Sequence, residues 1–405
     1  MKAIILAAGE GLRCRPLTFT RSKVMLPVAN KPILEHVVRA LAENGIKDII
    51  LIVGYEKERI MDYFEDGLTF GVNIKYVDQK AQLGTAHAVK RAEGLIGPED
   101  SEFLVLNGDN LVEARTIADL LENREGDATL LTVKMEDPED YGVVLTAGKK
   151  VLKILEKKPG KESNIVNTGI YVFTPPIFEY IEDTPISESG EYAITDTLQL
   201  MIDKGKKVTA VPTEAKWRDA AFAWDLLKAN ASALNTASDL KIEGRVEEGA
   251  VLKGKVSVGK NTKIRSGSYI VGPVMIGDNC DIGPSVVILP STTIGDNVSV
   301  RPFTEIRNSI IMDDTIISTH SRITNSLIGS NNSIGAYFVT EEKEGLKIII
   351  NGKLHPAPRL GTIIGDGNEI GDRVLVKAGV RIAVNCNVES GNTVHRNLSR
   401  DSVVL

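Results

Sequence analysis

The sequence is poor in aromatic residues and cysteine, and it has no excess of positive charge. Aromatic residues make up 5% of the 405 residues, and the net charge at pH 7 is −6. Proteins that bind nucleic acid usually carry a basic surface and aromatic side chains on which bases stack, so we expect no nucleic-acid partner. The three cysteines, Cys14, Cys280 and Cys386, lie too far apart to match a metal-binding or redox motif. They indicate reduced thiols in a cytoplasmic protein.

The sequence also lacks a recognisable targeting segment and a membrane span. Met1 and Lys2 lead directly into an apolar strand, and no apolar run approaches the roughly 20 residues that cross a bilayer. We therefore expect a soluble protein with no membrane partner. A length of 405 residues fits two domains, each large enough to bury its own core.

The two predicted domains have different hydrophobic periods. Over residues 1–238, apolar runs alternate with amphipathic stretches. This alternation predicts an α/β, Rossmann-like domain with a mostly parallel sheet and helices on both of its faces. The predicted strands are Lys2–Ala7, Asp48–Val53, Asn73–Val77, Phe103–Leu106 and Ala128–Val133, and the predicted helices include Ile33–Asn44, Thr85–Glu93 and about Trp224–Leu234.

Over residues 239–405, an aliphatic residue recurs every six positions. The series runs without interruption from Val246 to Ile306, then shifts by one position, and is regular again from Ile364. A period of six fits neither an α-helix nor an ordinary strand, but it is typical of hexapeptide repeats in an all-β parallel β-helix. The gap before Ile364 predicts an excursion from the coil at about residues 337–360.

The first strand leads into a glycine-rich loop that contains Gly9 and Gly11. Glycine lets backbone N–H groups approach a ligand closely, and Arg13 and Lys23 add positive charge. Such a loop can hold several phosphate oxygens at once. It has Cys14 in place of the third glycine of the dinucleotide fingerprint, and no Gly-Lys-Ser/Thr of a Walker loop follows. The structural alternative is a tight turn with surface cations.

The stretch from Leu6 to Pro27 resembles the signature of the sugar-1-phosphate nucleotidylyltransferases, in which a nucleoside triphosphate lies over this loop. One position departs from the family pattern, because Leu12 stands where threonine is usual and a hydroxyl contact is lost. The residues that the resemblance implies for nucleotide binding are Leu6, Ala8, Gly9 and Gly11, and those it implies for catalysis are Arg13 and Lys23.

The segment Gln79–Ala88 resembles the base-reading segment of the N-acetylglucosamine-1-phosphate uridylyltransferases. By that resemblance, Gln79 pairs with the pyrimidine edge, and Gly84 and Thr85 supply backbone that binds the nucleotide. A glutamine amide can both donate and accept, as a uracil or thymine edge requires. The alternative is an ordinary helix start in which Gln82 and Thr85 are capping residues.

Two aspartates are the candidate metal ligands. Asp109 follows a predicted strand, and Asp219 begins a second acidic stretch. Mg²⁺ favours one or two carboxylates plus substrate phosphates, and the resemblance implies that these two aspartates hold it. Asp225 is predicted as the N-cap of the last helix instead. The positions that resemble the family's sugar-phosphate pocket are Gly142, Glu156, Lys157 and Asn167.

These resemblances predict an enzyme that transfers a nucleotidyl group, with Mg²⁺, from UTP or dTTP to glucose-1-phosphate or N-acetylglucosamine-1-phosphate and releases pyrophosphate. The whole chain resembles the archaeal bifunctional uridylyltransferase/acetyltransferases. Their β-helices are left-handed and associate side by side, so the resemblance implies a left-handed coil and a homo-oligomer, as a trimer or a multiple of three.

Two other functions stay open. A bifunctional enzyme would also acetylate glucosamine-1-phosphate with acetyl-CoA, but the family's catalytic histidine aligns with Thr319, and His320 lies one position off. On a strand, one step turns a side chain to the other face. A non-catalytic assembly or regulatory subunit is the third possibility, because some translation-initiation-factor exchange subunits share this pair of domains. The intact loop and aspartates favour an enzyme.

Overall fold

The structure is a computed structural model that describes every residue except 137, 139–140, 156–162, 188–189 and 239. The chain forms two compact units. The first comprises Met1–Glu10, Ser22–Met25 and Ile33–Asp219, and the second comprises Gly11–Arg21, Leu26–Pro32 and Ala220–Leu405. The opening segment of the chain therefore contributes to both units.

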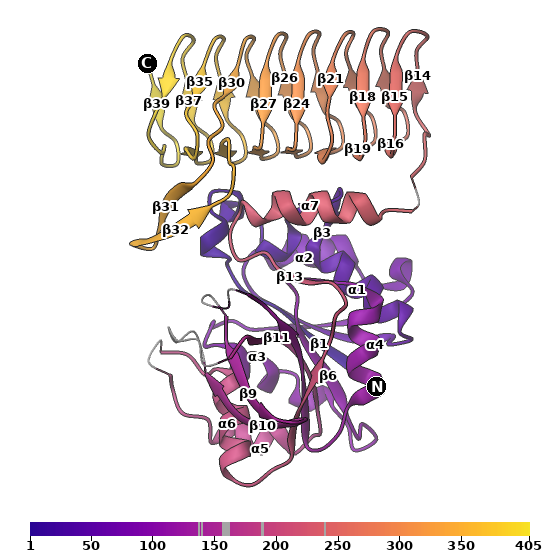
Figure 1. The fold of residues 1–405 in the computed structure, drawn as a ribbon, viewed down its shortest axis with the longest axis vertical. Coiled ribbons are helices and arrows are strands. Elements are labelled where there is room, and N and C mark those ends of the chain that lie inside the picture. Colours follow the sequence, from indigo (N-terminus) through magenta and orange to yellow (C-terminus); the bar gives the residue numbers. More distant parts are fainter. Residues whose placement is uncertain (137, 139–140, 156–162, 188–189, 239) are drawn as a thin grey trace. The chain divides into compact units, whose positions relative to one another are not determined.

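The first unit contains a nine-stranded mixed sheet (Figure 1). In spatial order its strands are β5 (Asn73–Asp78), β4 (Asp48–Val53), β1 (Lys2–Ala7), β6 (Phe103–Asn107), β11 (Ile165–Phe173), β8 (Ala128–Lys134), β12 (Val208–Pro212), β10 (Lys150–Leu155) and β9 (Val143–Ala147). The strands from β5 to β6 are parallel, and so are β8 and β12. β11 runs antiparallel to β6 and β8, and β10 runs antiparallel to β12 and β9. The sheet is therefore less uniformly parallel than the sequence pattern predicts.

Helices cover both faces of this sheet. On one face the core includes side chains of α1 (Ile33–Glu43), α2 (Lys57–Phe64) and α4 (Ala114–Asn123). On the other face it includes side chains of α3 (Thr85–Lys90), α5 (Ile177–Glu182) and α6 (Ile194–Asp203). In β1, Ile5 packs in the first core and Ile4 in the second. Burial on both faces explains why this strand is a continuous apolar run.

The second unit is a parallel β-helix, in which the chain visits three parallel sheets in turn (Figure 1). The first sheet contains β14 (Arg245–Val246), β17 (Lys263–Ile264), β20 (Asp281–Ile282), β23 (Ser299–Val300), β26 (Ile316–Ile317), β29 (Ser333–Ile334), β34 (Glu369–Ile370), β37 (Asn387–Val388) and β39 (Val403–Val404). The second contains β15 (Val251–Lys253), β18 (Tyr269–Val271), β21 (Val287–Ile288), β24 (Glu305–Arg307), β27 (Arg322–Thr324), β30 (Val339–Thr340), β35 (Leu375–Val376) and β38 (Thr393–Val394). The third contains β16 (Val256–Val258), β19 (Val274–Ile276), β22 (Thr292–Ile294), β25 (Ile310–Ile311), β28 (Leu327–Ile328), β33 (Ile363–Ile364) and β36 (Arg381–Ile382).

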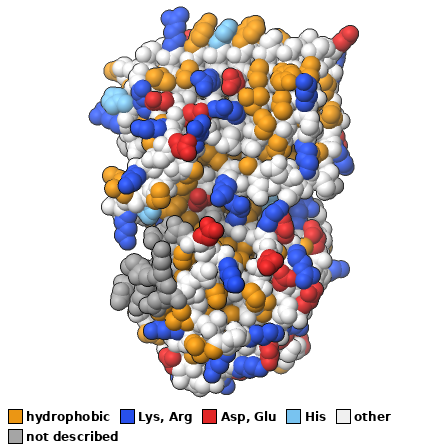
Figure 2. Space-filling view, in the orientation of Figure 1, with side chains coloured by type: hydrophobic (Ala, Val, Ile, Leu, Met, Phe, Trp, Pro, Cys, Tyr) orange, Lys and Arg blue, Asp and Glu red, His pale blue; other side chains and the backbone are white. Residues whose placement is uncertain are grey.

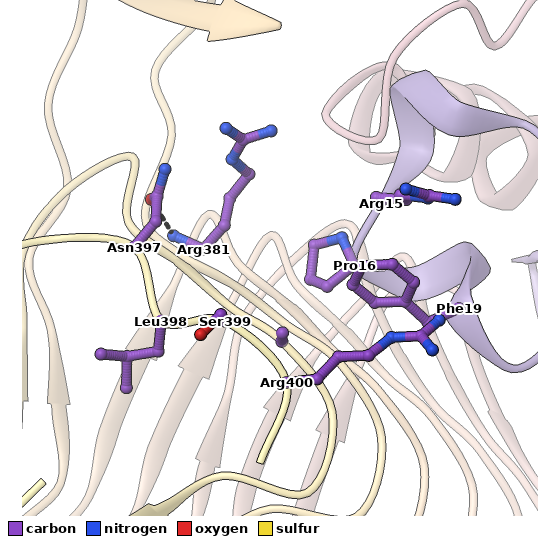
Figure 3. A pocket seen from close by; sticks show the side chains of 9 residues that line it. Arg15, Pro16, Phe19, Arg381, Asn397, Leu398, Ser399 and Arg400 are labelled. Atoms are coloured by element: carbon purple, nitrogen blue, oxygen red, sulfur yellow. Dashed lines mark hydrogen bonds between the residues drawn. The ribbon is translucent and has the colours of Figure 1, made fainter. Parts of the chain in front are cut away.

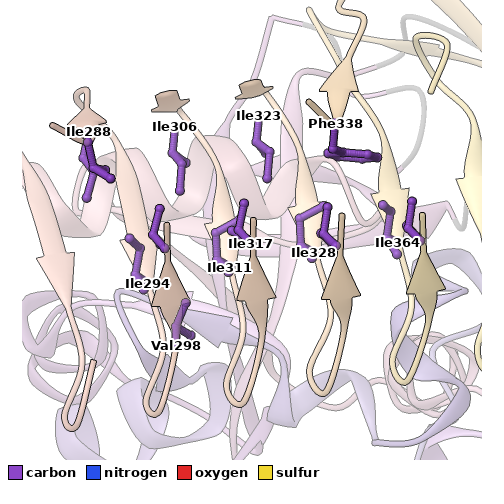
Figure 4. Packing of buried hydrophobic residues seen from close by; sticks show 14 of the residues in the cluster. Ile288, Ile294, Val298, Ile306, Ile311, Ile317, Ile323, Ile328, Phe338 and Ile364 are labelled. Carbon is purple, nitrogen blue, oxygen red and sulfur yellow. The ribbon is translucent and has the colours of Figure 1, made fainter. Parts of the chain in front are cut away.

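The six-residue period sets the register of these sheets. Ile264 pairs with Ile282, so three repeats complete one coil. Ile294 pairs with Ile311, one residue sooner, which accounts for the shift in the sequence period. The aliphatic side chains point inward and stack in ladders along the coil (Figure 4). Each fully buried isoleucine stabilises the coil by about 1.5–3 kcal/mol relative to an exposed one.

The excursion from the coil is an antiparallel hairpin of β31 (Leu346–Ile350) and β32 (Lys353–Ala357). It begins after β30, later than the predicted start at residue 337. The reason is that Phe338 takes a buried place in the core and β30 still pairs within the second sheet.

The opening segment contributes η1 (Leu12–Cys14), η2 (Leu17–Phe19), β2 (Pro27–Val28) and β3 (Lys31–Pro32) to the second unit, which also contains α7 (Asp225–Thr236). Three donors converge there on the carboxylate of Asp366. Arg21 Nη2 lies 2.5 Å from Oδ2, Thr20 Oγ1 donates to the same oxygen at 2.6 Å, and the Ser330 N–H donates to Oδ1 at 2.8 Å. These contacts explain why the segment that ends at Arg21 belongs with the β-helix.

On the face of the molecule shown in Figure 2, basic and acidic side chains are interspersed. Such a mixture fits the net charge of −6 and differs from the basic stripe of a nucleic-acid-binding surface. Among the described residues, no helix has both the length and the apolar character needed to cross a membrane.

Candidate active site

One lysine and two aspartates meet in the first unit, beyond the carboxyl end of β6. Lys23 begins η3 (Lys23–Met25), and Asp109 lies between β6 and β7 (Asn110–Val112). Asp219 ends β13 (Trp217–Asp219), which pairs antiparallel with β7. Lys23 Nζ lies 2.6 Å from Asp109 Oδ2 and 3.2 Å from Asp219 Oδ1. The three side chains are 13%, 28% and 26% exposed, so the cluster is open to a ligand.

The donor set fits a divalent ion that is completed by its substrate. Two carboxylates face one cationic group, so both are within reach of a single cation. In the part of the chain that the structure describes, no group of three or more His, Cys, Asp or Glu side chains is arranged to hold a metal. A metal at this cluster would therefore depend on Asp109, Asp219 and phosphate oxygens, which is the ligand set that Mg²⁺ accepts.

Backbone contacts fix the first half of the glycine-rich loop beside this cluster. The Leu6 carbonyl accepts a hydrogen bond from the Gly108 N–H at 2.8 Å, next to Asp109. The Ala8 carbonyl accepts from Gln82 Nε2 at 3.0 Å. Gly9 is exposed, and a Cβ built on it would meet no atom within 4 Å. The space over Gly9 is therefore available to a ligand.

The other half of the loop, from Gly11 onward, belongs to the second unit. Gly11 has a φ of 70°, a conformation that favours glycine, and its carbonyl accepts from Thr18 Oγ1 at 2.9 Å. Leu12 is 46% exposed. The Arg13 guanidinium lies 5.6 Å from the centre of the Phe222 ring. The catalytic role of Arg13 stays a prediction.

The base-reading segment is held in one conformation by buried contacts. Gln79 is buried, and its Nε2 lies 3.2 Å from the Gly84 carbonyl and 2.9 Å from His87 Nδ1. Burial, and then the charge of Arg91, lowers the pKa of His87. The neutral imidazole can accept at Nδ1, so both amide hydrogens of Gln79 have acceptors. No described residue donates a hydrogen bond to Oε1 of Gln79.

Gly84 and Thr85 serve the fold of this segment. Gly84 has a φ of +104°, and a Cβ there would lie 2.5 Å from the Tyr192 carbonyl oxygen. Thr85 Oγ1 accepts a hydrogen bond from the Ile194 N–H at 2.9 Å. The hydroxyl of Thr85 is therefore used within the protein, and its backbone is the part available to a nucleotide.

Gly54 and Gln82 support the site in ways that the sequence interpretation missed. Gly54 follows β4, and a Cβ on it would lie 3.0 Å from Ala8 atoms and 3.2 Å from the Gln79 carbonyl. A Cβ at these distances would force the neighbouring atoms to shift, so a glycine directly after a core strand was the available signal. Gln82, considered as a capping residue, instead binds the Ala8 carbonyl of the glycine-rich loop.

The structure brings two of the predicted sugar-phosphate residues together. The Asn167 N–H donates to the Gly142 carbonyl at 2.9 Å, and the Asn167 amide donates to the Tyr171 hydroxyl at 2.8 Å. The neighbouring Tyr141 ring packs edge-on against Trp217 of β13, with ring centres 5.7 Å apart. This places Gly142 and Asn167 near the strand that carries Asp219. Glu156 and Lys157 lie outside the described residues.

Two residues outside this cluster differ from the sequence interpretation. Asp225 is the first residue of α7, and the N-cap is Trp224. Oδ2 of Asp225 accepts a hydrogen bond from the Phe222 N–H at 2.7 Å. His320 lies at a corner between β26 and β27, not on a strand, with a φ of 58°. Its ring stacks between Phe303 and Tyr337, 4.9 Å from each ring centre. The left-handed backbone thus turns His320 onto the outer surface.

Comparison with known proteins identifies the chain's relatives. The family model described as "Nucleotidyl transferase" matches residues 2–236, and the model described as "GMPPB C-terminal domain" matches residues 270–390. The chain is 39% identical to "Bifunctional protein GlmU" of Methanococcus maripaludis, over all of this chain and 97% of that protein. It is 34% identical to a glucose-1-phosphate thymidylyltransferase of Streptomyces griseus, over 85% of each chain.

Solved structures resemble the nucleotidyltransferase part. One is the crystal structure of a putative glucose-1-phosphate thymidylyltransferase from Bacillus anthracis in complex with sucrose, with a TM-score of 0.53 and 32% identity. The match covers 60% of this chain and 98% of the chain in that crystal structure. Another is UDP-glucose pyrophosphorylase with UDP-glucose, with a TM-score of 0.52 and 26% identity over 58% of this chain and 99% of its own.

A family match over more than half of the chain, with relatives that span its whole length, shows the class of the protein: it is a nucleotidyltransferase. The chain belongs to the nucleotidyl transferase family, and its second part matches the GMPPB C-terminal domain. The enzyme class predicted from the glycine-rich loop is confirmed.

Proposed function

We propose that this enzyme transfers a uridylyl or thymidylyl group from UTP or dTTP to a hexose-1-phosphate, either glucose-1-phosphate or N-acetylglucosamine-1-phosphate. The observation that carries the proposal is the cluster of Lys23, Asp109 and Asp219, because it joins a cation and two carboxylates next to Gly108, which hydrogen-bonds to Leu6. The full-length relative called bifunctional protein GlmU and the thymidylyltransferase of Streptomyces griseus support these two substrate classes.

The reaction needs no nucleophilic side chain. A phosphate oxygen of the sugar-1-phosphate attacks the α-phosphorus of the triphosphate, one P–O bond forms, and the bond to the departing pyrophosphate breaks. The protein contributes positioning and charge neutralisation, with Arg13, Lys23 and the backbone of Leu6, Ala8, Gly9 and Gly11 at the triphosphate. A Mg²⁺ held by Asp109 and Asp219 would neutralise the negative charge of the phosphate oxygens. Gly142, Asn167, Glu156 and Lys157 are proposed to hold the sugar phosphate.

The fixed amide of Gln79 supports a preference for uracil and thymine over cytosine. Its Nε2 is engaged by Gly84 and His87, so Oε1 is the atom proposed to meet the base. N3 of uracil and thymine carries a hydrogen that this oxygen can accept, whereas N3 of cytosine is itself an acceptor. The backbone of Gly84 and Thr85 is proposed to lie against the same base.

The remaining features of the proposal follow from the family resemblance. We propose a transferase domain of residues 1–238 and a left-handed β-helix of residues 239–405, which joins copies of the chain into a trimer or a multiple of three. We propose a cytoplasmic location. The word "bifunctional" in the name of the full-length relative favours a second activity, for which acetyl transfer is the candidate that the family resemblance implies. The stacked, exposed position of His320 favours a structural β-helix instead.

The test is pyrophosphate release, measured for each nucleoside triphosphate with each sugar-1-phosphate. We expect release with UTP or dTTP and none without added Mg²⁺. Lys23→Ala should lower kcat/KM by about 10²-fold or more, because it removes a positive charge that stabilises the transition state. Lys204→Ala is the matched control, since it removes a lysine from an exposed ion pair with Asp183. Absence of release with every pair of substrates would contradict the proposal. Turnover of acetyl-CoA with glucosamine-1-phosphate, abolished by His320→Ala, would establish the second activity.

A further inference from the structure

The second unit contains a pocket of about 600 Å³ that the proposed reaction does not use (Figure 3). Arg15 and Phe19 line it from the opening segment, and Arg381, Asn397 and Arg400 line it from the last coils of the β-helix. The volume lies within the range of sites for small molecules. No lining residue is acidic, and three of the lining residues are arginines.

One donor of the Arg381 guanidinium lacks a hydrogen-bond acceptor within the described part of the chain. Its Nη2 donates to the Ile349 carbonyl at 3.1 Å, but its Nε is buried without a hydrogen-bond partner. No acidic side chain among the described residues forms an ion pair with Arg381, and burial lowers the pKa of this group. Burying a charge without a counter-charge is costly, so the Arg381 guanidinium favours an anion in the pocket that its side chain lines.

Arg400 and Phe19 form the opposite wall. The Arg400 guanidinium lies 3.8 Å from the centre of the Phe19 ring, and Figure 3 shows its side chain extended toward that ring. Arg15 lies 4.8 Å from the same ring centre. The Arg400 guanidinium, which stacks on the ring, keeps its N–H groups in its own plane, where they can meet an anion. None of the described acidic residues is paired with Arg400.

Asn397 adds a neutral donor. Its Oδ1 accepts the backbone N–H of Arg381 at 2.8 Å, which fixes the amide and leaves Nδ2 as the remaining hydrogen-bonding group (Figure 3). Leu398 gives the pocket an apolar wall. Planar arginine groups match phosphate oxygens in pairs, and the apolar wall suits the body of a small organic molecule.

We propose that this pocket binds the phosphate group of a phosphorylated small molecule, with Arg381 and Arg400 as its principal ligands. Binding would also restrain the segment from Arg15 to Phe19. The proposal does not depend on the proposed transferase reaction, because the pocket is built without Lys23, Asp109 or Asp219.

The first test is titration of the full chain with inorganic phosphate by calorimetry, at constant ionic strength set with chloride. We expect one binding event that Lys23→Ala retains. Arg381→Gln and Arg400→Gln should each weaken it at least about tenfold, since each removes a charge-assisted contact. Arg396→Gln is the matched control, because Arg396 is exposed on the same coil and does not line the pocket. Arg400 is also exposed, so its variant tests the site even if Arg381→Gln fails to fold.

The second test locates the phosphate by hydrogen exchange. We expect phosphate to slow exchange at residues 14–20 and 381–400 in the parent protein and not in Arg400→Gln. Equal phosphate affinity in the parent, Arg381→Gln and Arg400→Gln would overturn the proposal. So would the loss of all binding in Lys23→Ala, because the phosphate would then occupy the transferase site.

Discussion

Replacing Asp366 with asparagine tests the buried ion pair that holds the segment ending at Arg21 within the second unit. The side chains of Arg21 and Asp366 are 7% and 10% exposed, and the pair is 2.5 Å apart. In Asp366→Asn the guanidinium keeps its charge in the same buried place without a counter-charge. Removing one partner of a buried pair costs about 3–5 kcal/mol.

The expected effect is large enough to measure by calorimetric or circular-dichroism melting. In proteins of 150–250 residues, 1 kcal/mol corresponds to about 2–4 °C in the unfolding midpoint, so Asp366→Asn should lower the midpoint of the second unit by roughly 6–20 °C. Arg359→Ala is the control in the same unit. It breaks a 2.9 Å pair with Glu344 whose side chains are 55% and 74% exposed, and such pairs contribute about 0–1 kcal/mol.

A double variant separates the charge effect from lost packing. Arg21→Met combined with Asp366→Asn removes both charges and should be more stable than Asp366→Asn alone, because no uncompensated charge stays buried. The reasoning would be refuted if Asp366→Asn and Arg359→Ala had the same unfolding midpoint. It would also be refuted if the double variant had no higher midpoint than Asp366→Asn.

Three further predictions concern single residues. Gly84→Ala should raise the KM for the nucleotide, because its Cβ would lie 2.5 Å from the Tyr192 carbonyl at a φ of +104°; an unchanged KM in steady-state kinetics would contradict this. The folded state lowers the pKa of His87 below its ordinary 6.5, so the unfolded chain binds more protons and stability should fall as the pH drops through about 6.5. Melting of the parent and His87→Gln from pH 5 to 8 measures this, and equal pH slopes would count against it. Burial raises the pKa of Cys280 to about 11, so a thiol reagent at pH 8 should modify it only after unfolding, and fast labelling of the native protein would show otherwise.

Elements whose pattern depends on local burial were predictable from the sequence. The strand Lys2–Ala7 has the predicted bounds because its apolar side chains are buried on both faces. The β-helix was predictable because each coil repeats the same inward position, so even the shortened coil before Ile311 left a mark on the period. The later strands of the first sheet escaped prediction, since β11 takes an antiparallel place between β6 and β8 that only long-range pairing determines.

The candidate site was predictable where residue chemistry was enough and unpredictable where partners mattered. Lys23, Asp109 and Asp219 were selected by charge and position, and the structure brings them into contact. The role of His87 depends on its 2.9 Å approach to Gln79, which no sequence spacing reveals. The division of the opening segment between two units was also hidden, because it depends on Asp366, a residue more than 300 positions away.

The alternation of the opening segment between the two units has a consequence for how this enzyme can be recombined. Residues 11–21 and 26–32 pack with the β-helix, while 22–25 carry Lys23 into the first unit. A chimaera joined at residue 238 to another β-helix would keep Arg21 and would keep its ion pair only if that β-helix carries an acidic residue at the position of Asp366. An exchange that preserves this ion pair would therefore transfer residues 11–21 and 26–32 together with the β-helix.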